Sequence, residues 1–501
     1  MQRPPSANQR LVSLPPAMAV LFEELEQRPR PQWFAAGDPP GQKLGSGGGT
    51  AHLLVAAWRA TGGGADFADW LRASRKLIIH GAGESRRLPA YAAVGKPLMP
   101  VPSLANSSGP PVPCTLLDLQ LPFCERVLRQ APPRAAVMIA SGDTLLRFGE
   151  PLPPLPDVDV LGFGMSVPPE RAARHGVFFT PHASPAELAF FLQKPPPGRI
   201  RELAADYDYL VDTGLWVLSA RAVDVLLRCC AWNAARAEFA GGLAKRYELY
   251  DQFGLSLGSA PAMPDVEIGA LTSAVVRLPQ PEFHHFGTGR QIVESVSALR
   301  RLELARAHET GGAPERIVDQ YVQNCRFEAA LDPDQNRTLW AENSTIPRSW
   351  HLAHDHVLVG VPANDWQLRL EPGVCLDFTP VGETDYCLRY CGIDDAFRGA
   401  VDAPGTLWRG KPAADWFRAR GIDAAAAGLA PGQDIFTAPL FPILPAGKVE
   451  PAFLEWLFGR NPVPNPAFAR CWLESERLSA QQIPARANFR RLYAQRAANR
   501  G

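Results

Sequence analysis

The sequence lacks an excess of charge of either sign, and this absence argues against one class of partner. Its 501 residues include 51 lysines and arginines and 51 aspartates and glutamates. A surface that binds a large polyanion needs a basic excess, because each phosphate contact draws on a cationic side chain. We therefore expect no nucleic acid partner.

Disulfide motifs, zinc motifs, a secretory leader and membrane-spanning runs are also missing. The nine cysteines include no CxxC pair; the closest are Cys229 beside Cys230, and Cys387 four residues before Cys391. An odd number of unpatterned cysteines argues against a disulfide framework and fits a reducing cytosol. No apolar run reaches bilayer-spanning length, and no charged start precedes an apolar core at the N-terminus, so we expect a cytoplasmic protein with no membrane partner.

Buried strands alternate with helices over the first part of the chain. Apolar runs at 76–80, 135–140 and 158–163 predict strands, and 114–130 predicts a helix before the second of them. Such alternation is typical of α/β proteins with a doubly wound, mostly parallel sheet, whose ligands bind at the carboxyl ends of the strands. Because 501 residues exceed one ordinary core, we expect this to be the first of several domains, at 1–290.

The pattern changes in the second half of the chain. Apolar residues from Ile292 to Leu302 recur at helical spacing and predict a linking helix at 291–315. Beyond it, alternating apolar and polar residues with turn signals predict an all-β domain at 316–440, either a parallel β-helix (a β-solenoid) or another all-β arrangement. Helical patterning returns at 441–501. We expect the β domain to be structural, or to form a homo-oligomer, rather than to carry catalysis.

The segment that follows the first strand is rich in groups that bind phosphate. Glycine lets the main chain approach an anion closely, a hydroxyl donates to it, arginine offers forked donors, and lysine adds a point charge. The residues concerned are Gly81, Ala82, Gly83, Ser85, Arg86, Arg87 and Lys96. The segment is neither a Walker P-loop, which needs Gly-Lys-Ser/Thr, nor a dinucleotide fingerprint, which needs a third glycine. A solvated turn is the alternative interpretation.

An aspartate follows the second strand. Ser141, Gly142 and Asp143 end this strand, which puts a carboxylate on the same edge of the sheet as the segment 81–96. A turn aspartate that caps the following segment is the alternative. Phosphate donors, cations and a carboxylate able to hold magnesium are together what nucleotidyl transfer requires.

These residues resemble a known signature. Ala82–Leu88 with Lys96-Pro97 is similar to the loop of sugar-nucleotide pyrophosphorylases of the glycosyltransferase-A-like superfamily. The longer string Gly81–Lys96 resembles the guanylyltransferase half of the bacterial bifunctional fucokinase/L-fucose-1-phosphate guanylyltransferases. Similarity continues over most of the chain, through Gly45–Thr50, Ser141-Gly142-Asp143, Phe286-Gly287-Thr288, Gly360-Val361-Pro362, Gly373–Phe378 and Ala438–Pro442.

The sequence departs from this family in two places. Ala82-Gly83 stands where the family has a pair of glycines. The bifunctional members also continue into a galactokinase-like sugar kinase with a phosphate loop of its own, whereas this sequence ends at Gly501 without one. We therefore expect the transferase alone, with the sugar 1-phosphate supplied from elsewhere.

The resemblance implies an enzyme that transfers GMP from GTP to a sugar 1-phosphate, with L-fucose 1-phosphate as the best match, and releases pyrophosphate. It implies that Arg87, Lys96 and a Mg²⁺ ion on Asp143 stabilise charge on the phosphates, and that Lys194 meets the sugar phosphate. For Lys194 an ordinary surface lysine is a close alternative. Another 6-deoxyhexose or a heptose 1-phosphate, another base, or a non-catalytic nucleotide-sugar scaffold stay open.

Other site residues follow from the resemblance, each beside a plainer interpretation. Asp212 and Gly214 face the sugar, or belong to a turn. His285, Gly287 and Thr288 lie near the sugar, or cap the helix that comes next. The nucleotide-binding set comprises Gly81, Ala82, Gly83, Ser85, Arg86 and Gly142.

Three further features allow two interpretations each. A second metal ligand would be Asp251 or Glu248. The run Gly45–Thr50 either approaches the base or phosphates, or is a flexible connector. The last feature is a trio of histidines, His351, His354 and His356. Strand-like alternation would place them on two faces, so we expect them to be solvated or packed rather than metal ligands.

Overall fold

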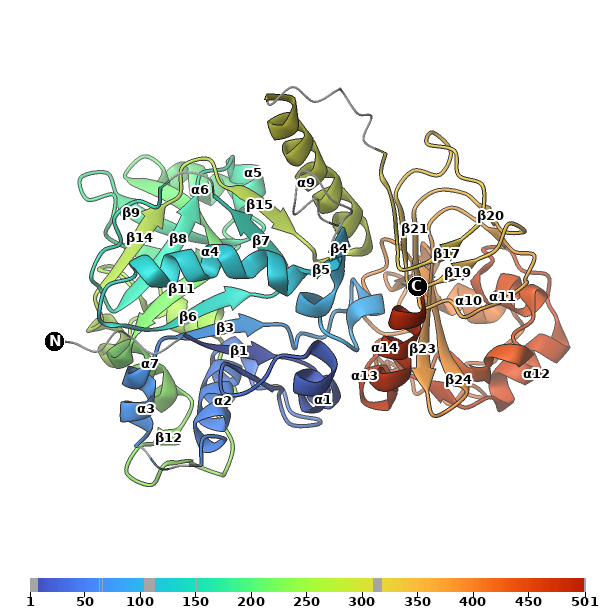
Figure 1. Ribbon diagram of the computed structural model, residues 1–501, viewed down its shortest axis with the longest axis horizontal. Coiled ribbons are helices and arrows are strands. Elements are labelled where there is room, and N and C mark those ends of the chain that lie inside the picture. The colour runs from blue at the N-terminus through green and yellow to red at the C-terminus, as the bar shows by residue number, and fades with distance from the viewer. Residues whose placement is uncertain are drawn as a thin grey trace. The chain divides into compact units, whose positions relative to one another are not determined.

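The chain divides into two compact units that are not contiguous in sequence. A computed structural model describes residues 8–62, 64, 66–102, 113–148, 151–309 and 318–499. One unit comprises Met1–Gly83 and Leu116–His284, and the other Glu84–Thr115 and His285–Gly501 (Figure 1). The expected first domain at 1–290 therefore differs from the observed unit, because residues 84–115 pack with the second half of the chain.

The first unit is built on a nine-stranded sheet in the order β10-β9-β11-β6-β3-β1-β2, in which β11 also pairs with β8, and β8 with β14. The strands are β1 Gln9–Ser13, β2 Trp33–Ala36, β3 Lys76–His80, β6 Ala135–Ser141, β8 Val160–Met165, β9 Gly176–Pro181, β10 Phe190–Gln193, β11 Tyr207–Ser219 and β14 Ser273–Arg277. Four pairs are parallel, β1 with β2 and β3, β3 with β6, and β8 with β14. The other four, three of them made by β11, are antiparallel. The α/β class is as predicted, but the sheet is mixed rather than mostly parallel.

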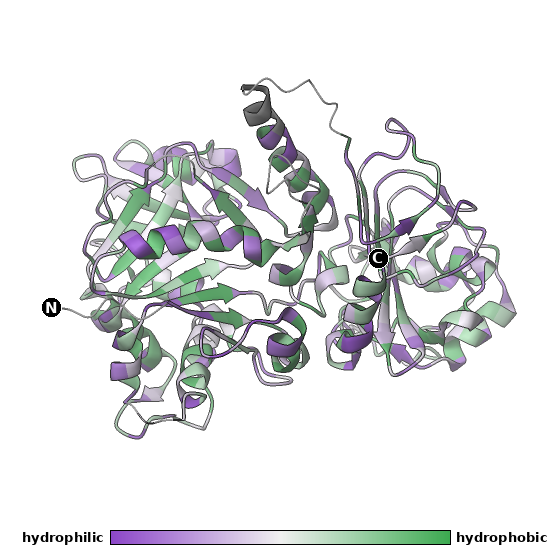
Figure 2. Ribbon diagram, in the orientation of Figure 1, coloured by the Kyte–Doolittle hydropathy of each residue, from purple (hydrophilic) through white to green (hydrophobic). Residues whose placement is uncertain are grey.

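Apolar strands and amphipathic helices form the core of this unit. Figure 2 shows strands of the sheet as largely apolar, and Ile78, Ile139 and Trp216 are fully buried. The helices are α1 Pro16–Glu26, α2 Gly45–Arg59, α3 Phe67–Ala73, α4 Leu116–Gln130, α5 Pro169–Ala172, α6 Pro197–Leu203, α7 Ala220–Cys229, α8 Val266–Gly269, the π-helix η3 Leu249–Phe253 and the 3₁₀ turn η4 Gly254–Ser256. The remaining strands are β7 Thr144–Arg147, β12 Trp232–Asn233, β13 Glu238–Phe239 and β15 Glu282–His285.

The glycine run Gly45–Thr50 is not a loop but the start of α2. The amides of Gly47 and Gly48 donate to the Tyr247 carbonyl at 2.9 and 3.0 Å, and the Ser46 amide donates to Glu248 Oε2 at 3.0 Å. A Cβ atom on Gly47 or Gly48 would lie within 2.9 Å of the 245–247 segment, so glycine permits this close approach. The first amides of the helix, which could otherwise bind an anion, are therefore already satisfied by protein groups.

The second unit contains a seven-stranded sheet in the order β16-β18-β21-β23-β24-β27-β28. These strands are Gln320–Gln323, Leu339–Glu342, His356–Val359, Val374–Val381, Asp385–Gly392, Phe441–Pro445 and Arg477–Leu478. The first four are parallel and pair at intervals of 17 to 19 residues, whereas β23, β24, β27 and β28 are antiparallel. A parallel solenoid across all of 316–440 is therefore not what the structure contains, and helix α10 also interrupts this range.

Helices and short strands surround this sheet. The helices are α9 Gly289–Glu309, α10 Ala413–Ala419, α11 Pro451–Phe458, α12 Pro466–Glu474, α13 Ile483–Arg486, α14 Phe489–Ala498 and the 3₁₀ turns η1 Pro89–Tyr91, η2 Lys96–Leu98 and η5 Ala446–Lys448. The short strands are β4 Pro100–Pro102, β5 Pro113–Thr115, β17 Arg326–Phe327, β19 Thr345–Ile346, β20 His351–Leu352, β22 Arg369–Leu370, β25 Leu407–Trp408 and β26 Lys411–Pro412.

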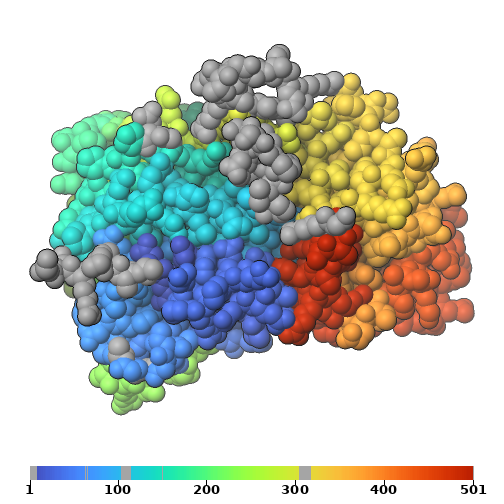
Figure 3. Space-filling model, in the orientation of Figure 1, coloured from blue at the N-terminus to red at the C-terminus, as the bar shows by residue number. Residues whose placement is uncertain are grey.

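Two predicted ranges of the second half match only in part. The linking helix expected at 291–315 is α9, and residues 310–315 lie outside the described residues. The tail at 441–501 is mostly helical, but β27 and β28 join the sheet. In Figure 3 the red surface of the C-terminal residues lies beside the yellow and orange surface of the same unit. No helix among the described residues is long and apolar enough to cross a membrane.

The three histidines of this unit lie in different surroundings. His356 is fully buried, its Nδ1 lies 3.0 Å from the Val374 carbonyl, and burial lowers its pKa to about 4. His354 lies 3.1 Å from Asp355, and His351 is exposed. Among the described residues no group of three histidine, cysteine, aspartate or glutamate side chains could hold a metal ion.

Candidate functional site

In the first unit, the carboxyl ends of β3 and β6 meet, since His80 pairs with Ser141. Two glycines predicted to bind nucleotide lie at this edge. The Gly81 amide donates to the Ser13 carbonyl, and the Gly142 amide to the His80 carbonyl, both at 2.8 Å. Both amides are therefore already bound by protein carbonyls, and a contact of Gly81 or Gly142 with the nucleotide stays a prediction. Ala82 is half-buried and Gly83 is exposed.

Asp143 sits in a turn that neighbouring polar groups hold in place. The Ser141 hydroxyl donates to Asp143 Oδ1 at 2.8 Å. The buried Gln120 amide donates to the Ser141 carbonyl at 2.8 Å and also to the Thr144 carbonyl. The carboxylate is half-buried at the end of the strand, so the fold presents it at a fixed place.

Asp212 lies close to this turn on β11. Its Oδ1 accepts from the Gly214 amide at 2.9 Å and from Trp216 Nε1 at 3.1 Å, and burial raises its pKa to about 7. Gly214 adopts φ +75°, and a Cβ atom there would lie 3.1 Å from Ser141 Cβ. The structure therefore brings Asp212 and Gly214 beside the Asp143 turn, but one Asp212 oxygen already serves the bulge in β11.

Tyr250, in η3, lies near Asp212 and Asp143 and was not predicted from the sequence. Burial raises the pKa of its phenol, and the negative charges of Asp212 and Asp143 raise it further. Its ring packs edge-on against Trp216, with centroids 5.6 Å apart. Its phenol is therefore a protonated donor near two carboxylates. The only sequence signal was its position next to Asp251, one of the two residues considered as a second metal ligand.

The donor set at this edge fits magnesium bound together with a substrate. Among the described residues no three-ligand cage exists, and Mg²⁺ is commonly held by one or two carboxylates plus substrate phosphates and water. Asp143 offers such a carboxylate. Of the two candidates for a second ligand, Glu248 Oε2 accepts from the Ser46 amide and hydroxyl at 3.0 and 3.1 Å, whereas Asp251 is exposed.

Lys194 follows β10 directly. Its side chain is exposed, its backbone adopts φ +48°, and its amide donates to the His175 carbonyl at 3.0 Å. The backbone is therefore anchored while the ammonium group faces solvent. This placement agrees equally with a sugar-phosphate contact and with a surface lysine.

The second unit begins inside the segment predicted to bind phosphate, and the two arginines of this segment differ in their contacts. Arg86 donates through Nε to Glu84 at 2.6 Å, and through Nη1 to Asp434 at 3.0 Å and the Phe397 carbonyl at 2.8 Å. It also stacks over Phe436, 4.2 Å from the ring centroid. Burial lowers the pKa of its guanidinium, but these carboxylates outweigh burial and hold the pKa above the ordinary value.

Arg87 has none of these ties. Its side chain is exposed, and among the residues the structure describes its guanidinium has no hydrogen-bond or ion-pair partner. Its backbone carbonyl accepts from the Gly289 amide at 3.3 Å. The nucleotide-binding role predicted for Arg86 therefore competes with protein contacts, while Arg87 keeps a forked cation available for phosphate.

Residues beyond Arg87 are held by the strands of the second unit. The Pro89 carbonyl accepts from Arg389 Nη2, and the Tyr91 hydroxyl accepts from Trp340 Nε1 at 2.7 Å. Ser85 adopts φ +50°, and Lys96 is half-buried at the start of η2. Arg87 and Lys96 belong to the same compact unit as the strands of 316–440. The expectation that those strands are structural rather than catalytic stays a prediction.

His285, Gly287 and Thr288 form the capping turn before α9. Thr288 Oγ1 accepts from the Gln291 amide at 3.1 Å, His285 Nδ1 lies 3.0 Å from Gln291 Oε1, and a Cβ on Gly287 would meet the His285 ring at 2.2 Å. Helix capping accounts for all three residues, and a role at the sugar stays a prediction.

Comparison with known proteins gives two curated relatives. The L-fucokinase/L-fucose-1-P guanylyltransferase of Bacteroides fragilis is 36% identical over 488 residues, 97% of this chain and 50% of the relative. The bifunctional fucokinase/GDP-fucose pyrophosphorylase of Arabidopsis thaliana is 23% identical over 511 residues, 91% of this chain and 48% of the relative. The chain thus spans about half the length of the curated relatives it matches.

A solved structure and a family model were also matched. The mannose-1-phosphate geranyltransferase from Thermus thermophilus is 14% identical, covers 78% of this chain and 96% of its own, and has a TM-score of 0.26, too low to carry weight. Residues 68–263 match the fucose pyrophosphorylase domain. The chain is therefore similar to fucose pyrophosphorylases over residues 68–263, and to the bifunctional fucokinase/guanylyltransferases along nearly its whole length.

Proposed function

We propose that this chain transfers GMP from GTP to L-fucose 1-phosphate and releases pyrophosphate. The observation that carries the proposal lies within residues 68–263, which match the fucose pyrophosphorylase domain. There the Arg87 guanidinium is exposed and has no protein partner among the described residues, whereas that of the adjacent Arg86 is bound to Asp434. An exposed forked cation in a phosphate-binding segment is suited to charge that builds on a triphosphate.

The chemistry needs no general base. An oxygen of the sugar 1-phosphate, already anionic at neutral pH, attacks the α-phosphorus of GTP in line. The new oxygen–phosphorus bond replaces the bond to the β-phosphate, and pyrophosphate leaves with the electron pair. The chain therefore has to orient the two phosphates and stabilise the charge. Arg87 and Lys96 would contact the nucleotide phosphates, and Lys194 the attacking phosphate.

Asp143 would hold a Mg²⁺ ion together with the triphosphate. Such an ion neutralises charge on the phosphates and on the leaving pyrophosphate. The Ser141 hydroxyl and the Gln120 amide keep the Asp143 turn in one conformation, so that little ordering is left for the moment of binding.

The direct test is a pyrophosphate-release screen of purified protein with several sugar 1-phosphates and all four nucleoside triphosphates. We expect the highest kcat/KM with GTP and L-fucose 1-phosphate, and loss of activity with chelator. Preference for a heptose or another 6-deoxyhexose would keep the reaction and change the substrate. Binding of a nucleotide sugar without any pyrophosphate release would replace the enzyme with a scaffold.

We also propose that the protein works in the cytoplasm. All nine cysteines are free thiols in the structure, and five of them are buried. Burial raises the pKa of several of these thiols, among them Cys387, which makes them poorly reactive. Assembly into a homo-oligomer through the β unit stays a prediction, which sedimentation would test.

A further inference from the structure

A buried ion pair lies in the sheet of the second unit. Asp377 on β23 pairs in register with Arg389 on β24, and Arg389 Nε donates to Asp377 Oδ2 at 2.6 Å. The Arg389 side chain is 1% exposed and the Asp377 side chain is 7% exposed. Thr379 Oγ1 donates to the other Asp377 oxygen at 3.1 Å. The carboxylate is thus fixed from two sides.

Stability alone does not account for this pair. Removing two charges from water costs several kcal/mol per ion as an order of magnitude, and apolar residues of similar size often serve a fold equally well. Arg389 Nη1 has no hydrogen-bond partner among the described residues, so the guanidinium is not fully satisfied. Its remaining donor, Nη2, reaches the Pro89 carbonyl. The contact that an apolar pair could not replace is the one with Pro89.

Pro89 lies two residues after Arg87, and the backbone is held on both sides of Arg87. On the N-terminal side Arg86 is bound to Asp434. On the C-terminal side Leu88 is 1% exposed and its amide donates to the Ser85 carbonyl at 2.9 Å. With Pro89 bound as well, the one long side chain of this stretch that stays exposed is that of Arg87.

We propose that Arg389 is a positioning residue for Arg87. Arg389 touches no substrate; through the Pro89 carbonyl it fixes the turn from which Arg87 projects, and Asp377 holds Arg389 in the orientation that makes this bond. The proposal rests on the proposed function, because it assigns to the β unit a part in orienting the cation that meets the nucleotide phosphates.

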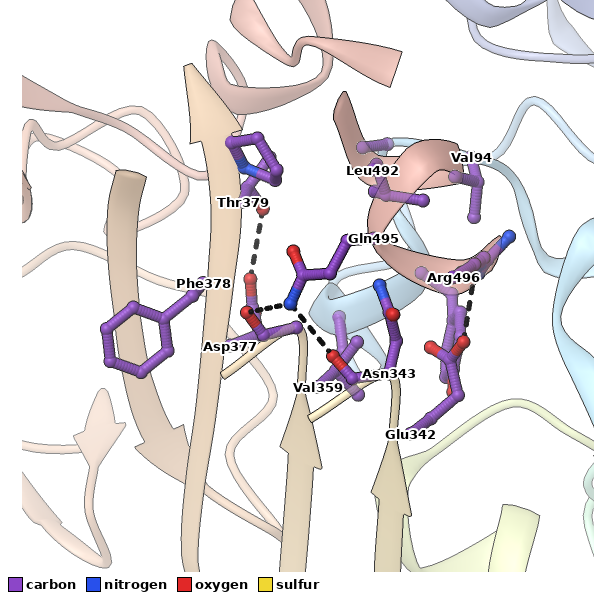
Figure 4. Close-up of a pocket in the computed structure, with 15 residues that line it drawn as sticks. Val94, Glu342, Asn343, Val359, Asp377, Phe378, Thr379, Leu492, Gln495 and Arg496 are labelled. Atoms are coloured by element: carbon purple, nitrogen blue, oxygen red, sulfur yellow. Dashed lines mark hydrogen bonds and ion pairs between the residues drawn. The ribbon is translucent and has the colours of Figure 1, made fainter. Parts of the chain in front are cut away.

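A small cavity lies beside the ion pair, lined by Asp377 of the sheet and Tyr91 of the turn. Figure 4 shows it bordered by Asp377, Glu342 and Arg496, with Arg496 Nε donating to Glu342 Oε1 at 3.1 Å. Its volume of about 20 Å³ is large enough for one water molecule, and its two carboxylates are matched by two guanidinium groups, so that it offers no net charge for an ion. Of these buried charges, Arg389 is the one whose hydrogen bond reaches the turn, at the Pro89 carbonyl.

The test removes the ion pair without leaving a lone charge. We expect the double variant Arg389→Met with Asp377→Leu to fold and to lower kcat/KM at least tenfold. In an Arg87→Ala background the same double change should cost less than twofold, because the residue it positions is gone. Equal losses in both backgrounds would overturn the proposal.

A matched control separates positioning from stability. Arg420 is 2% exposed and donates to the carbonyls of Trp456, Leu457 and Gly459, away from the turn. Arg420→Met should lower the melting temperature. At assay temperatures well below that melting temperature, kcat/KM should be unchanged. If Arg420→Met lowers kcat/KM as much as the double variant does, the Arg389 effect is one of stability, and the proposal falls.

Hydrogen exchange gives a readout that does not depend on activity. The amides of Leu88, Ala92 and Gly95 donate to carbonyls within the turn, at 2.9 Å each. In the double variant these amides should exchange at least tenfold faster, while those of Arg420→Met keep wild-type rates. Unchanged exchange in the double variant would show that Arg389 does not hold the turn, and would overturn the proposal. If the wild-type protein releases no pyrophosphate, the proposed function is wrong. The exchange result still decides whether Arg389 holds the turn.

Discussion

Exchange of each adjacent arginine for lysine tests whether Arg87, and not Arg86, meets the nucleotide. Arg87 is exposed and has no partner among the described residues, so Arg87→Lys should leave the fold intact. A lysine offers a point charge in place of a planar fork and cannot reproduce a bidentate contact that strengthens in the transition state. We expect turnover to fall at least tenfold, a rise of about 1.4 kcal/mol in the barrier.

For Arg86 the structure predicts the opposite balance. Its guanidinium donates to Glu84, Asp434 and the Phe397 carbonyl and stacks on Phe436. A lysine can keep one of these contacts. Two lost charge-assisted bonds, discounted because Glu84 and Asp434 are 34% and 39% exposed, amount to about 1–3 kcal/mol of stability. Arg86→Lys should therefore lower the melting temperature and change turnover less than Arg87→Lys does.

Both quantities are measured on the same two variants. Steady-state pyrophosphate release, recorded at least 10 °C or so below the lower melting temperature, gives turnover, and a thermal melt gives stability. If Arg86→Lys proves the more damaging to turnover at that temperature, the phosphate contact belongs to Arg86. If neither variant loses activity, this segment does not hold the nucleotide.

Three further predictions concern other residues. Asp143→Asn should lower activity at least tenfold with little change in melting temperature, since the Ser141 hydroxyl can still donate to an amide oxygen; wild-type turnover at limiting magnesium would contradict the metal role. Stability should fall by up to about 4 kcal/mol as pH rises from about 4 to about 7, because folded Asp212 (pKa about 7) keeps a proton that the unfolded chain has released. Asp212→Asn should flatten this dependence in denaturant unfolding, and an unchanged slope would show that the carboxyl is not protonated in the fold. His356→Ala should cost about 2 kcal/mol or more of stability by emptying a buried position, whereas His351→Ala, at an exposed one, should change the melting temperature little; equal melts would refute the burial argument.

Local sequence signals predicted the elements whose pattern is complete within a few residues. The run Lys76–His80 is β3 with the predicted bounds, and 135–140 falls one residue short of β6. The strands β1 and β2 gave weaker signals, because prolines surround them and their partners lie elsewhere in the chain. The antiparallel placement of β11 between β6 and β8 depends on pairs such as Leu215 with Ala140 and Val211 with Met165, which are 75 and 46 residues apart and which no local pattern encodes.

The candidate site shows the same division between local and distant causes. The sequence placed Arg86 and Arg87 together in one phosphate-binding prediction, but their contacts differ because Arg86 is bound to Asp434, which is 348 residues away. The glycines of 45–50 were ambiguous because the group that binds their amides, the Tyr247 carbonyl, is about 200 residues distant. Composition and spacing carry no information about such partners, and the buried Arg389–Asp377 pair was missed for the same reason.

The chain crosses between its two units three times, after Gly83, Thr115 and His284. Neither unit is therefore a cassette that a single pair of cuts can excise. A gene fragment that stops near codon 290 would encode residues 84–115 without the strands that bind them, and would leave Leu88 and Tyr91, both 1% exposed in the whole chain, facing water. Truncated or recombined versions of the chain therefore have to keep residues 84–115 and 285–501 from the same parent protein.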